Sequence, residues 1–264
     1  MKNALSILML LAAVALGPWC GCSKSKPTDT THHAVTLNVV SVTSSSASLA
    51  WTMATESDFS AYRLYRSTKA GLGRSGTPVG TFSNVRQISA HDTALCPGRT
   101  YYYKVFVDYG QSTMTASNEA STTTNAATGL IIGLDPAIAV MANGGSSAVE
   151  VWVANVEDLF GATFSIMYDH SKIAIDSTKG HDFLGADVIY FDHVAQDTID
   201  VAITRTSPQS GISGGGSLAA IYFHALTSGA DSIYFGPVSL EKNDGALINN
   251  FNALSKRNVK IIVQ

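Results

Sequence analysis

Apolar and polar residues alternate in short segments along most of the chain. The segments "VTLNVVSV", "SASLAWTM", "SAYRLYRS" and "TYYYKVFV" follow one another between Val35 and Val107. Alternation with a period of two indicates strands that bury one face. No long stretch has the 3.6-residue period of an amphipathic helix. The pattern therefore predicts an all-β fold, with the short, regularly spaced strands that are typical of β-sandwiches.

Strands of the same kind fill the second half of the chain. They are "AVEVWV", "TIDVAIT", "LAAIYFHA", "DSIYFGPVSL" and "NVKIIV", and the turn signals "GISGGG" and "KNDG" lie between them. A Thr-rich break, "STTTNAATG", runs from Ser121 to Gly129 and separates the two halves. We therefore predict two β-sandwiches, residues 34–124 and residues 130–264, joined by a linker at residues 125–129.

The first residues have the pattern of an export signal. Lys2 precedes an apolar run, residues 4–16, which is too short to span a bilayer comfortably. In "GPWCGCSKSK", Cys22 follows the small residue Gly21, as a lipoprotein signal peptidase requires. We predict a signal peptide at residues 1–21 and lipidation of Cys22; an ordinary secretory signal cut nearby is the alternative.

A lipidated cysteine would hold the chain on a membrane surface, because each buried methylene contributes ~0.8 kcal/mol. Residues 22–33, "CSKSKPTDTTHH", are polar and are expected to form a flexible tether. Ser23, rather than Asp, follows Cys22, which resembles the signal for export to the outer membrane of a Gram-negative cell. The expected location is the cell surface, reached through a lipid anchor.

Composition narrows the possible partners. The 264-residue chain has a formal net charge of -3 and no run of basic residues, so nucleic acid is not an expected partner. Once the signal is removed, Cys96 is the one cysteine besides Cys22, and no internal disulfide is expected. Stability must then come from the packing of the sheets.

No motif in the sequence predicts an enzyme, a cofactor or a metal. The His-Glu-x-x-His and Gly-x-Ser-x-Gly motifs are absent. "GISGGGS" lacks the Lys-Ser/Thr ending of a phosphate loop, and "KNDG" lacks the alternating acidic ligands of a calcium loop. Glu157 and Asp158 are neighbours in a loop, whereas a glycosidase needs two facing carboxylates. The chain is therefore predicted to be non-catalytic.

The first half resembles a fibronectin type III domain. Trp51 stands where the family has its core tryptophan, and "YRLYRS" is similar to the strand that follows. "LCPGRTYYYKV" resembles the Leu-x-Pro-Gly segment that leads into a tyrosine corner, with Tyr101 as the corner residue. "SNEAS" is similar to the last strand. The resemblance covers residues 34–124 and implies an immunoglobulin-like sandwich that acts as a spacer.

The second half resembles a cohesin, the receptor half of the cohesin–dockerin pair. "NVEDLFGATFSIMYDHSKIAI" is similar to a loop, a strand and a Tyr-Asp turn of that family. "SGGGSLAAIYFHA" resembles its Gly-rich turn and Ile-x-Phe strand, and "VSLEKNDGALI" its late strand and Asp-Gly hairpin. The three segments occur in the family's order over residues 130–264. The resemblance implies a jelly-roll sandwich.

The cohesin resemblance also implies a partner. In that family the outward face of the "ATFSIM" strand belongs to the sheet that receives a dockerin. The partner implied is a dockerin-like module of another exported protein, in polysaccharide breakdown. Well-known cellulosomal cohesins carry Asn and Asp on this strand, but the matching positions here are Gly161 and Thr163. From the alternation we predict a partner-binding face made of Thr163, Ser165, Asp200, Ala202 and Thr204, with Arg205 at the strand end.

Carbohydrate binding is the alternative function. Sugars stack on flat aromatic rings, and Trp152 points away from the core positions Val151 and Val153. In this alternative the second half is a carbohydrate-binding module at the cell surface, polysaccharide is the ligand and Trp152 is the sugar contact. Tyr190 and Tyr222 are weaker candidates for the same role.

Overall fold

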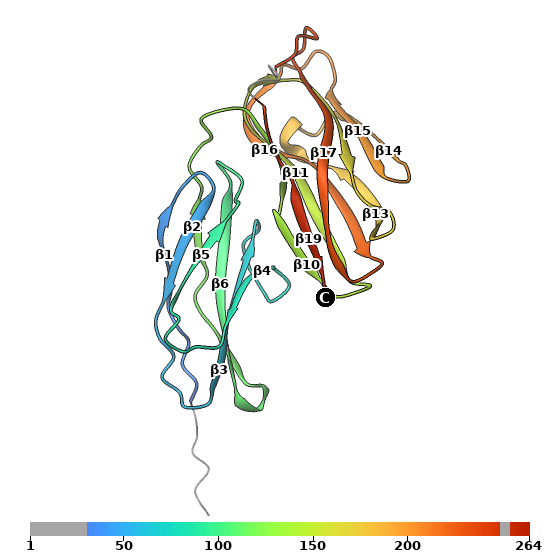
Figure 1. The fold of residues 1–264 in the computed structure, drawn as a ribbon. Coiled ribbons are helices and arrows are strands. Elements are labelled where there is room, and N and C mark those ends of the chain that lie inside the picture. The colour runs from blue at the N-terminus through green and yellow to red at the C-terminus, as the bar shows by residue number, and fades with distance from the viewer. Residues whose placement is uncertain (1–30, 249–253) are drawn as a thin grey trace, which may run out of the picture. The chain divides into compact units, whose positions relative to one another are not determined.

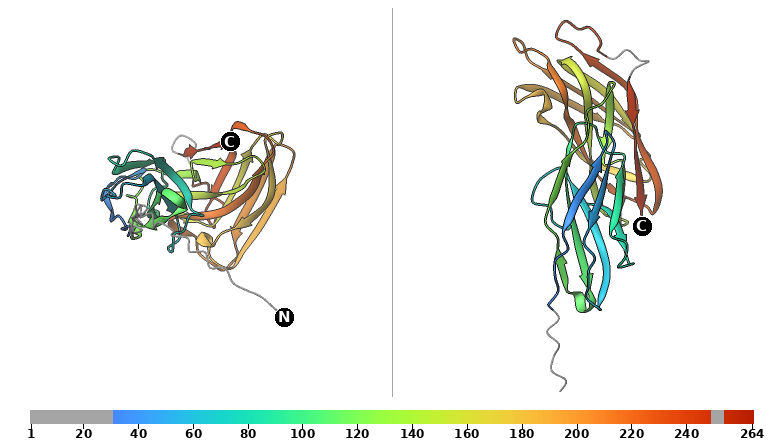
Figure 2. Two further views of the ribbon diagram at one scale, coloured as in Figure 1. Left: turned by 90° about the horizontal axis from the view of Figure 1, so that it is seen from below. Right: turned by 90° about the vertical axis from the view of Figure 1, so that its left-hand side faces the viewer.

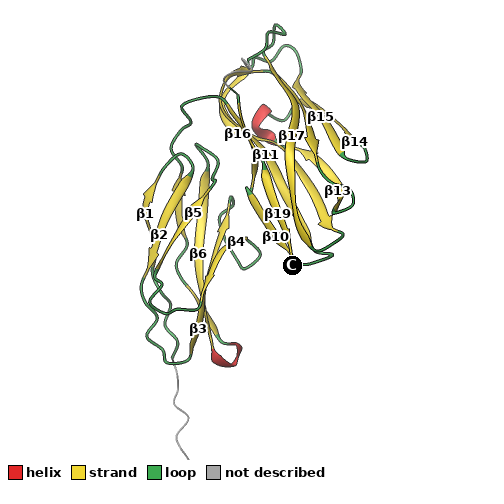
Figure 3. Cartoon of the chain, in the orientation of Figure 1, coloured by secondary structure: helices red, strands yellow, loops and turns green. Residues whose placement is uncertain are grey.

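The computed structural model describes residues 31–248 and 254–264 (Figure 1). The predicted signal peptide and its lipidation site, Cys22, lie outside the described residues. Residues from His32 to Gln264 form one compact unit. Strands dominate it, as the all-β pattern predicts (Figure 3). No helix of the described part is long and apolar enough to cross a membrane.

The strands before residue 124 form the first sandwich. One sheet has the order β1-β2-β5, and the other has the order β4-β3-β6-β7, with β8 also paired to β6. The bounds are β1 Leu37–Val42, β2 Ser46–Trp51, β3 Phe59–Ser67, β4 Thr77–Phe82, β5 Ser89–Thr93, β6 Thr100–Tyr109, β7 Met114–Ala116 and β8 Ala120–Thr123. A single 3-10 turn, η1 Gly110–Ser112, follows β6.

Aromatic side chains fill the core of the first sandwich. Trp51 is buried there, as the sequence predicts, and its ring packs against Tyr62 with the ring centroids 5.5 Å apart. Tyr101 is fully buried, and its hydroxyl accepts a hydrogen bond of 2.8 Å from the backbone N–H of Cys96. This bond back to the upstream chain is the contact expected of a corner tyrosine.

Two histidines at the start of the described chain are bound to the first sandwich. His32 Nε2 lies 3.0 Å from a carboxylate oxygen of Asp58, and its ring stacks on Tyr109 at 4.1 Å between centroids. The backbone N–H of His33 donates to Glu56 at 2.9 Å. The predicted flexible tether therefore overlaps the structured unit at its last two residues.

The strands after residue 130 form the second sandwich (Figure 2). Its larger sheet has the order β10-β19-β17-β12-β15-β14. The bounds are β10 Ile138–Met141, β12 Gly161–Met167, β14 Val188–Val194, β15 Thr198–Arg205, β17 Gly229–Glu241 and β19 Val259–Val263. The other sheet has the order β13-β16-β11-β9-β18. Its strands are β9 Ile131–Asp135, β11 Ser146–Leu159, β13 Ile173–Gly180, β16 Ile212–Ala225 and β18 Ser255–Arg257.

A separate hydrophobic core lies between these two sheets. Phe164 and Ile166 of β12 are buried in it, as are Val201 and Ile203 of β15. These are the inward positions that the alternation predicts. Apolar side chains of this kind suit a pleated, half-buried surface, and the residues between them therefore face outward.

One of the two turns that the sequence predicts is present, and the other is not. "KNDG" is a turn, in which the N–H of Gly245 donates to the carbonyl of Lys242 at 3.0 Å. "GISGGG", in contrast, lies mostly within β16, so the prediction of a turn there was wrong. The glycines are needed in a strand: Gly214 has a φ of +121°, and a Cβ at Gly216 would lie 2.3 Å from the ring of Phe183. A short 3-10 turn, η2 Asp182–Leu184, carries that ring.

Candidate functional site

The outward side of the six-stranded sheet carries most of the predicted partner-binding residues. In the strand register, Thr163 of β12 lies between Ala202 of β15 and Ser239 of β17. Phe191 of β14 continues this row beyond Ala202. We call this outward surface the open face. Its members are Gly161, Thr163, Ser165, Ile189, Phe191, Asp200, Ala202, Thr204, Ser239 and Glu241.

Two carboxylates on the open face are held by serine hydroxyls. Ser165 Oγ donates to Asp200 Oδ1 at 2.5 Å, across the pair β12–β15. Ser239 Oγ donates to Glu241 Oε1 at 3.0 Å along β17. Each hydroxyl satisfies only part of the capacity of its carboxylate, which has about four acceptor positions. The face therefore presents two oriented groups that can accept hydrogen bonds from a cationic or hydroxylated partner.

A shallow depression of about 300 Å³ lies on the open face, and its lining includes Asp200 and Ser239, the serine that holds Glu241. Strands β12, β15 and β17 supply its lining. All of its lining residues belong to the second sandwich: Thr163, Phe164, Ser165, Asp200, Val201, Pro237, Val238 and Ser239. Small side chains here let the backbone of a partner approach the sheet closely.

Two apolar side chains on β14 complete the open face, and sequence reasoning missed them. Phe191 is 67% exposed and Ile189 is 44% exposed. Their register partners Ala202 and Thr204 show that they share the outward side with Thr163. Apolar and polar residues do not alternate clearly in the segment "DVIYFDHV", so the pattern could not assign its two faces. The aromatic residue Phe191, just before the predicted strand "TIDVAIT", was the one hint in the sequence that this segment belongs to the face.

Arg205 does not join the open face. It follows Ile203 by two positions, so the alternation places it on the side of the core residues rather than beside Thr204. Its guanidinium donates a hydrogen bond to the backbone carbonyl of Leu184. The structure thus gives Arg205 a partner within the sandwich rather than a place on the predicted partner-binding face.

Trp152 lies on the outward side of the other sheet, as predicted, but it is covered. The guanidinium of Arg99 lies 4.4 Å from the centre of its ring and belongs to the first sandwich. The indole is only half-exposed, and its Nε1 is buried without a hydrogen-bond partner within the described chain. Because a cation occupies the ring face, Trp152 is not the open sugar platform that the sequence suggested.

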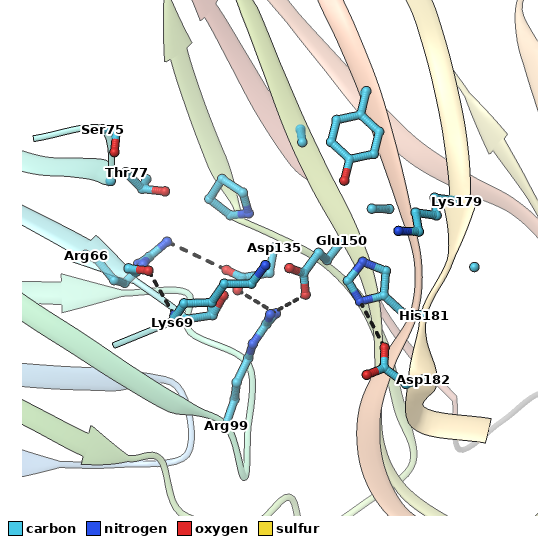
Figure 4. Close-up of a pocket in the computed structure, with 18 residues that line it drawn as sticks. Arg66, Lys69, Ser75, Thr77, Arg99, Asp135, Glu150, Lys179, His181 and Asp182 are labelled. Carbon is cyan, nitrogen blue, oxygen red and sulfur yellow. Dashed lines mark hydrogen bonds and ion pairs between the residues drawn. The ribbon is translucent and has the colours of Figure 1, made fainter. Parts of the chain in front are cut away.

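The same side of this sheet carries a row of charges. Lys179 of β13 lies opposite Ala220 of β16, which lies opposite Glu150 of β11, which lies opposite Asp135 of β9. Figure 4 shows Arg99 reaching toward both carboxylates of this row. Its Nη1 donates to Asp135 Oδ2 at 2.8 Å, and its Nη2 donates to Glu150.

A second arginine extends this ionic network into the first sandwich. Arg66 Nη1 donates to both oxygens of Asp92, at 2.8 and 2.9 Å, and its Nη2 lies 3.6 Å from Asp135. Arg66, Asp92, Arg99 and Asp135 are all buried. Burial alone lowers the pKa of each guanidinium, but the neighbouring carboxylates outweigh it and raise the pKa of Arg66 and of Arg99. Both arginines therefore stay charged.

Two further groups of side chains are of the types that bind metals or act as nucleophiles. Asp169, His170 and Asp197 offer ligand atoms within 4.8 Å of one another, so these side chains could hold a metal ion. The bond from His170, 2.7 Å to Asp197 Oδ1, lowers the pKa of Asp197. Cys96 is a free, buried thiol whose pKa is raised to about 12, mainly by burial. A thiol that stays protonated is a poor nucleophile, so Cys96 is structural.

Solved structures that are similar to this chain include several cohesin domains. A non-cellulosomal cohesin from the archaeon Archaeoglobus fulgidus is 17% identical, with a TM-score of 0.43, over 52% of this chain and 90% of that one. A cohesin from Clostridium acetobutylicum is 19% identical, with a TM-score of 0.43, over 52% and 92%. A type I cohesin–dockerin complex from Clostridium thermocellum gives 18%, a TM-score of 0.42, and 52% and 98%. No family model and no curated protein matches the chain.

Proposed function

We propose that the chain is a non-catalytic receptor whose open face docks a dockerin-like helical module of another exported protein. The observation that carries the proposal is the open face itself. It combines Ser-held carboxylates at Asp200 and Glu241, a shallow depression at Thr163, and the exposed ring of Phe191. Aromatic anchors beside oriented polar groups are typical of protein interfaces.

The shape and charge of this face suit a helix with basic or hydroxylated side chains. Thr163 and Ala202 are short, so a helix backbone can lie close to the strands. Asp200 lines the depression, and Glu241 is held by Ser239 of its lining, so both carboxylates can accept hydrogen bonds from donors on the helix. Charge-assisted hydrogen bonds of this type are roughly twice as strong as neutral ones. The order of cohesin-like segments in the sequence agrees with this choice of partner.

The proposal also includes the location of the chain in the cell and the role of the first sandwich. Lipidation at Cys22 anchors the chain to a membrane surface, the outer membrane where the cell has one, and the first sandwich serves as a fibronectin type III-like spacer. The partner is an exported protein active in polysaccharide breakdown. Changing Cys22 to Ser should move the protein from the membrane fraction to the soluble one; continued partition of the Cys22→Ser protein into detergent would rule out the lipid anchor.

Calorimetric titration of the full chain with dockerin-like modules of exported proteins tests the docking step. Asp200→Asn and Glu241→Gln keep the shape of the open face but remove its charges, so each should weaken binding about tenfold, which is ~1.4 kcal/mol. Asp192→Asn is the matched control, because Asp192 of β14 lies opposite the core residue Val201 and so on the other side of the sheet. Equal affinity for all three variants, or no binding by the unaltered chain, would refute the proposed function.

A further inference from the structure

A cleft of two adjoining parts lies over the charged row of the five-stranded sheet, and Figure 4 shows the residues that line the larger part. One part has a volume of about 430 Å³, and the adjoining part has a volume of about 380 Å³. They are continuous, because six residues line both: Thr68, Lys69, Arg99, Glu150, His181 and Asp182. A cleft of this size can hold a short oligomeric ligand rather than a single small ion.

The charged groups on the floor of the cleft are already paired. Arg99 binds Asp135 and Glu150, and Ala220, which is 2% exposed, lies in the row between Glu150 and Lys179. A buried network in which each charge has its partner is rigid and gains little from a new charge. The floor is therefore a fixed surface, and recognition of a ligand must come from the groups that stand around it.

Two lysines stand around the floor without partners. Lys69 follows β3 of the first sandwich, and Lys179 lies in β13 of the second. Both are exposed, and among residues 31–248 and 254–264 neither ammonium group makes a hydrogen bond or an ion pair. Figure 4 shows both side chains at the cleft, with the half-buried His181 near Lys179. Free cations on two sides of one cleft attract an anionic ligand.

One exposed carboxylate, that of Asp182, also lines both parts of the cleft, and it lies 4.0 Å from Nδ1 of His181. Aromatic rings and hydroxyls line much of the remaining wall. Tyr222, which is 40% exposed, is part of the wall of the larger hollow, and Phe183 lines the other hollow. The hydroxyl residues Thr68, Ser75 and Thr77 lie on the side of the first sandwich. Flat rings, neutral hydroxyls and free ammonium groups together match a sugar chain that carries carboxylates.

We propose that this cleft binds an acidic oligosaccharide, with Lys69 and Lys179 holding its carboxylates and Tyr222 stacking on a sugar ring. The site is distinct from the open face and takes a different class of ligand, so it goes beyond the docking function. Trp152 lines the smaller part of the same cleft, but Arg99 covers its ring, so the proposed stacking ring is Tyr222.

The test is a calorimetric titration of the full chain with a uronic-acid tetrasaccharide, a neutral glucose tetrasaccharide and inorganic phosphate. The uronate chain should bind at least tenfold more tightly than the neutral one, and phosphate should not displace it. The double variant Lys69→Ala/Lys179→Ala should weaken binding of the uronate at least tenfold without lowering the melting temperature, because both side chains are exposed and unpaired. Tyr222→Ala should weaken the uronate and the neutral chain by the same factor.

The matched control is Lys242→Ala/Lys260→Ala, which removes the same charge from outside the cleft and should leave uronate binding unchanged. Uronate binding that survives the Lys69→Ala/Lys179→Ala change, or equal affinity for the neutral chain, would overturn the proposal. Displacement of the uronate by phosphate would also overturn it, since the cleft would then be a simple anion site. Thr163→Arg on the open face should leave uronate binding intact, so the two proposals fail separately.

Discussion

The two outward faces of the second sandwich are built from the same strand pattern but present opposite surfaces. The central row of the open face reads Phe191, Ala202, Thr163 and Ser239. The corresponding row on the five-stranded sheet reads Lys179, Ala220, Glu150 and Asp135. The first row carries no charge: it consists of one aromatic ring, one methyl group and two hydroxyl side chains. The second row has a cation on one side of its alanine and two carboxylates on the other.

The two faces differ in the groups that form hydrogen bonds and ion pairs with their carboxylates. On the open face, Asp200 is held by Ser165 of its own sheet and remains exposed to solvent. On the other face, Asp135 is buried and is held by Arg99 and Arg66 of the first sandwich. A charge that is buried in this way is committed to structure, while an exposed and partly satisfied one is free to meet a partner. Burial, more than residue type, therefore separates carboxylates that hold the structure together from carboxylates that can meet a partner.

The largest effect expected from this comparison follows removal of Asp135. Asp135→Ala leaves Arg99 and Arg66 buried with too few carboxylates, and breaking a buried pair in this way costs ~3–5 kcal/mol. The measurement is the free energy of unfolding from denaturant titration. Asp200→Ala on the open face is the control and should change stability by no more than ~0.5 kcal/mol. Similar losses in the two variants would show that the faces do not differ as described.

A smaller effect is expected from Phe191→Ala, and it concerns binding rather than folding. The ring is 67% exposed, so its removal should leave the melting temperature unchanged. As an aromatic anchor it should contribute ~2 kcal/mol to the docking of a dockerin-like module, a roughly thirtyfold change in affinity. Tyr222→Ala, an aromatic change on the other face, should leave docking unaltered. Calorimetry on both variants shows whether docking is confined to one face.

The smallest expected effect is a loss of stability of the first sandwich at low pH, through Glu56. The N–H of His33 donates to Glu56 and lowers the pKa of that carboxyl from 4.5 to about 2, although burial opposes the shift. A lowered pKa contributes stability that is present above pH 4.5 and lost as the pH falls toward about 2. Denaturant titrations over this range should show the loss in the unaltered chain and a smaller loss in Glu56→Gln. At neutral pH, Glu56→Gln should not change docking on the open face.

The sequence predicted the strands of both faces because alternation is a local signal. Thr163 and Ser165 face outward and Phe164 and Ile166 inward, as the pattern indicates. The same rule, applied one step further, would have placed Arg205 with Ile203 rather than with Thr204. That error came from treating the strand end as free, although its guanidinium binds the carbonyl of Leu184, 21 residues away along the chain.

Contacts between distant segments could not be predicted in this way. Trp152 points outward, as its position between Val151 and Val153 requires. No pattern in the sequence indicates that Arg99 covers its ring. Likewise, nothing in "LDPA" shows that Asp135 is buried beneath two arginines. Such pairings depend on how sheets pack, and a single sequence carries no pattern for them.

The most direct test of the central claim is the Thr163→Arg variant, titrated by calorimetry against a dockerin-like module that binds the unaltered chain. Thr163 lines the depression, and in the register of the sheet it lies between Ala202 and Ser239. A long cationic side chain there should block the close approach of a helix, so binding should be lost while the melting temperature changes little. Trp152→Ala on the other face should bind as the unaltered chain does. Full affinity of Thr163→Arg, or loss of docking in Trp152→Ala, would contradict the assignment of docking to the open face.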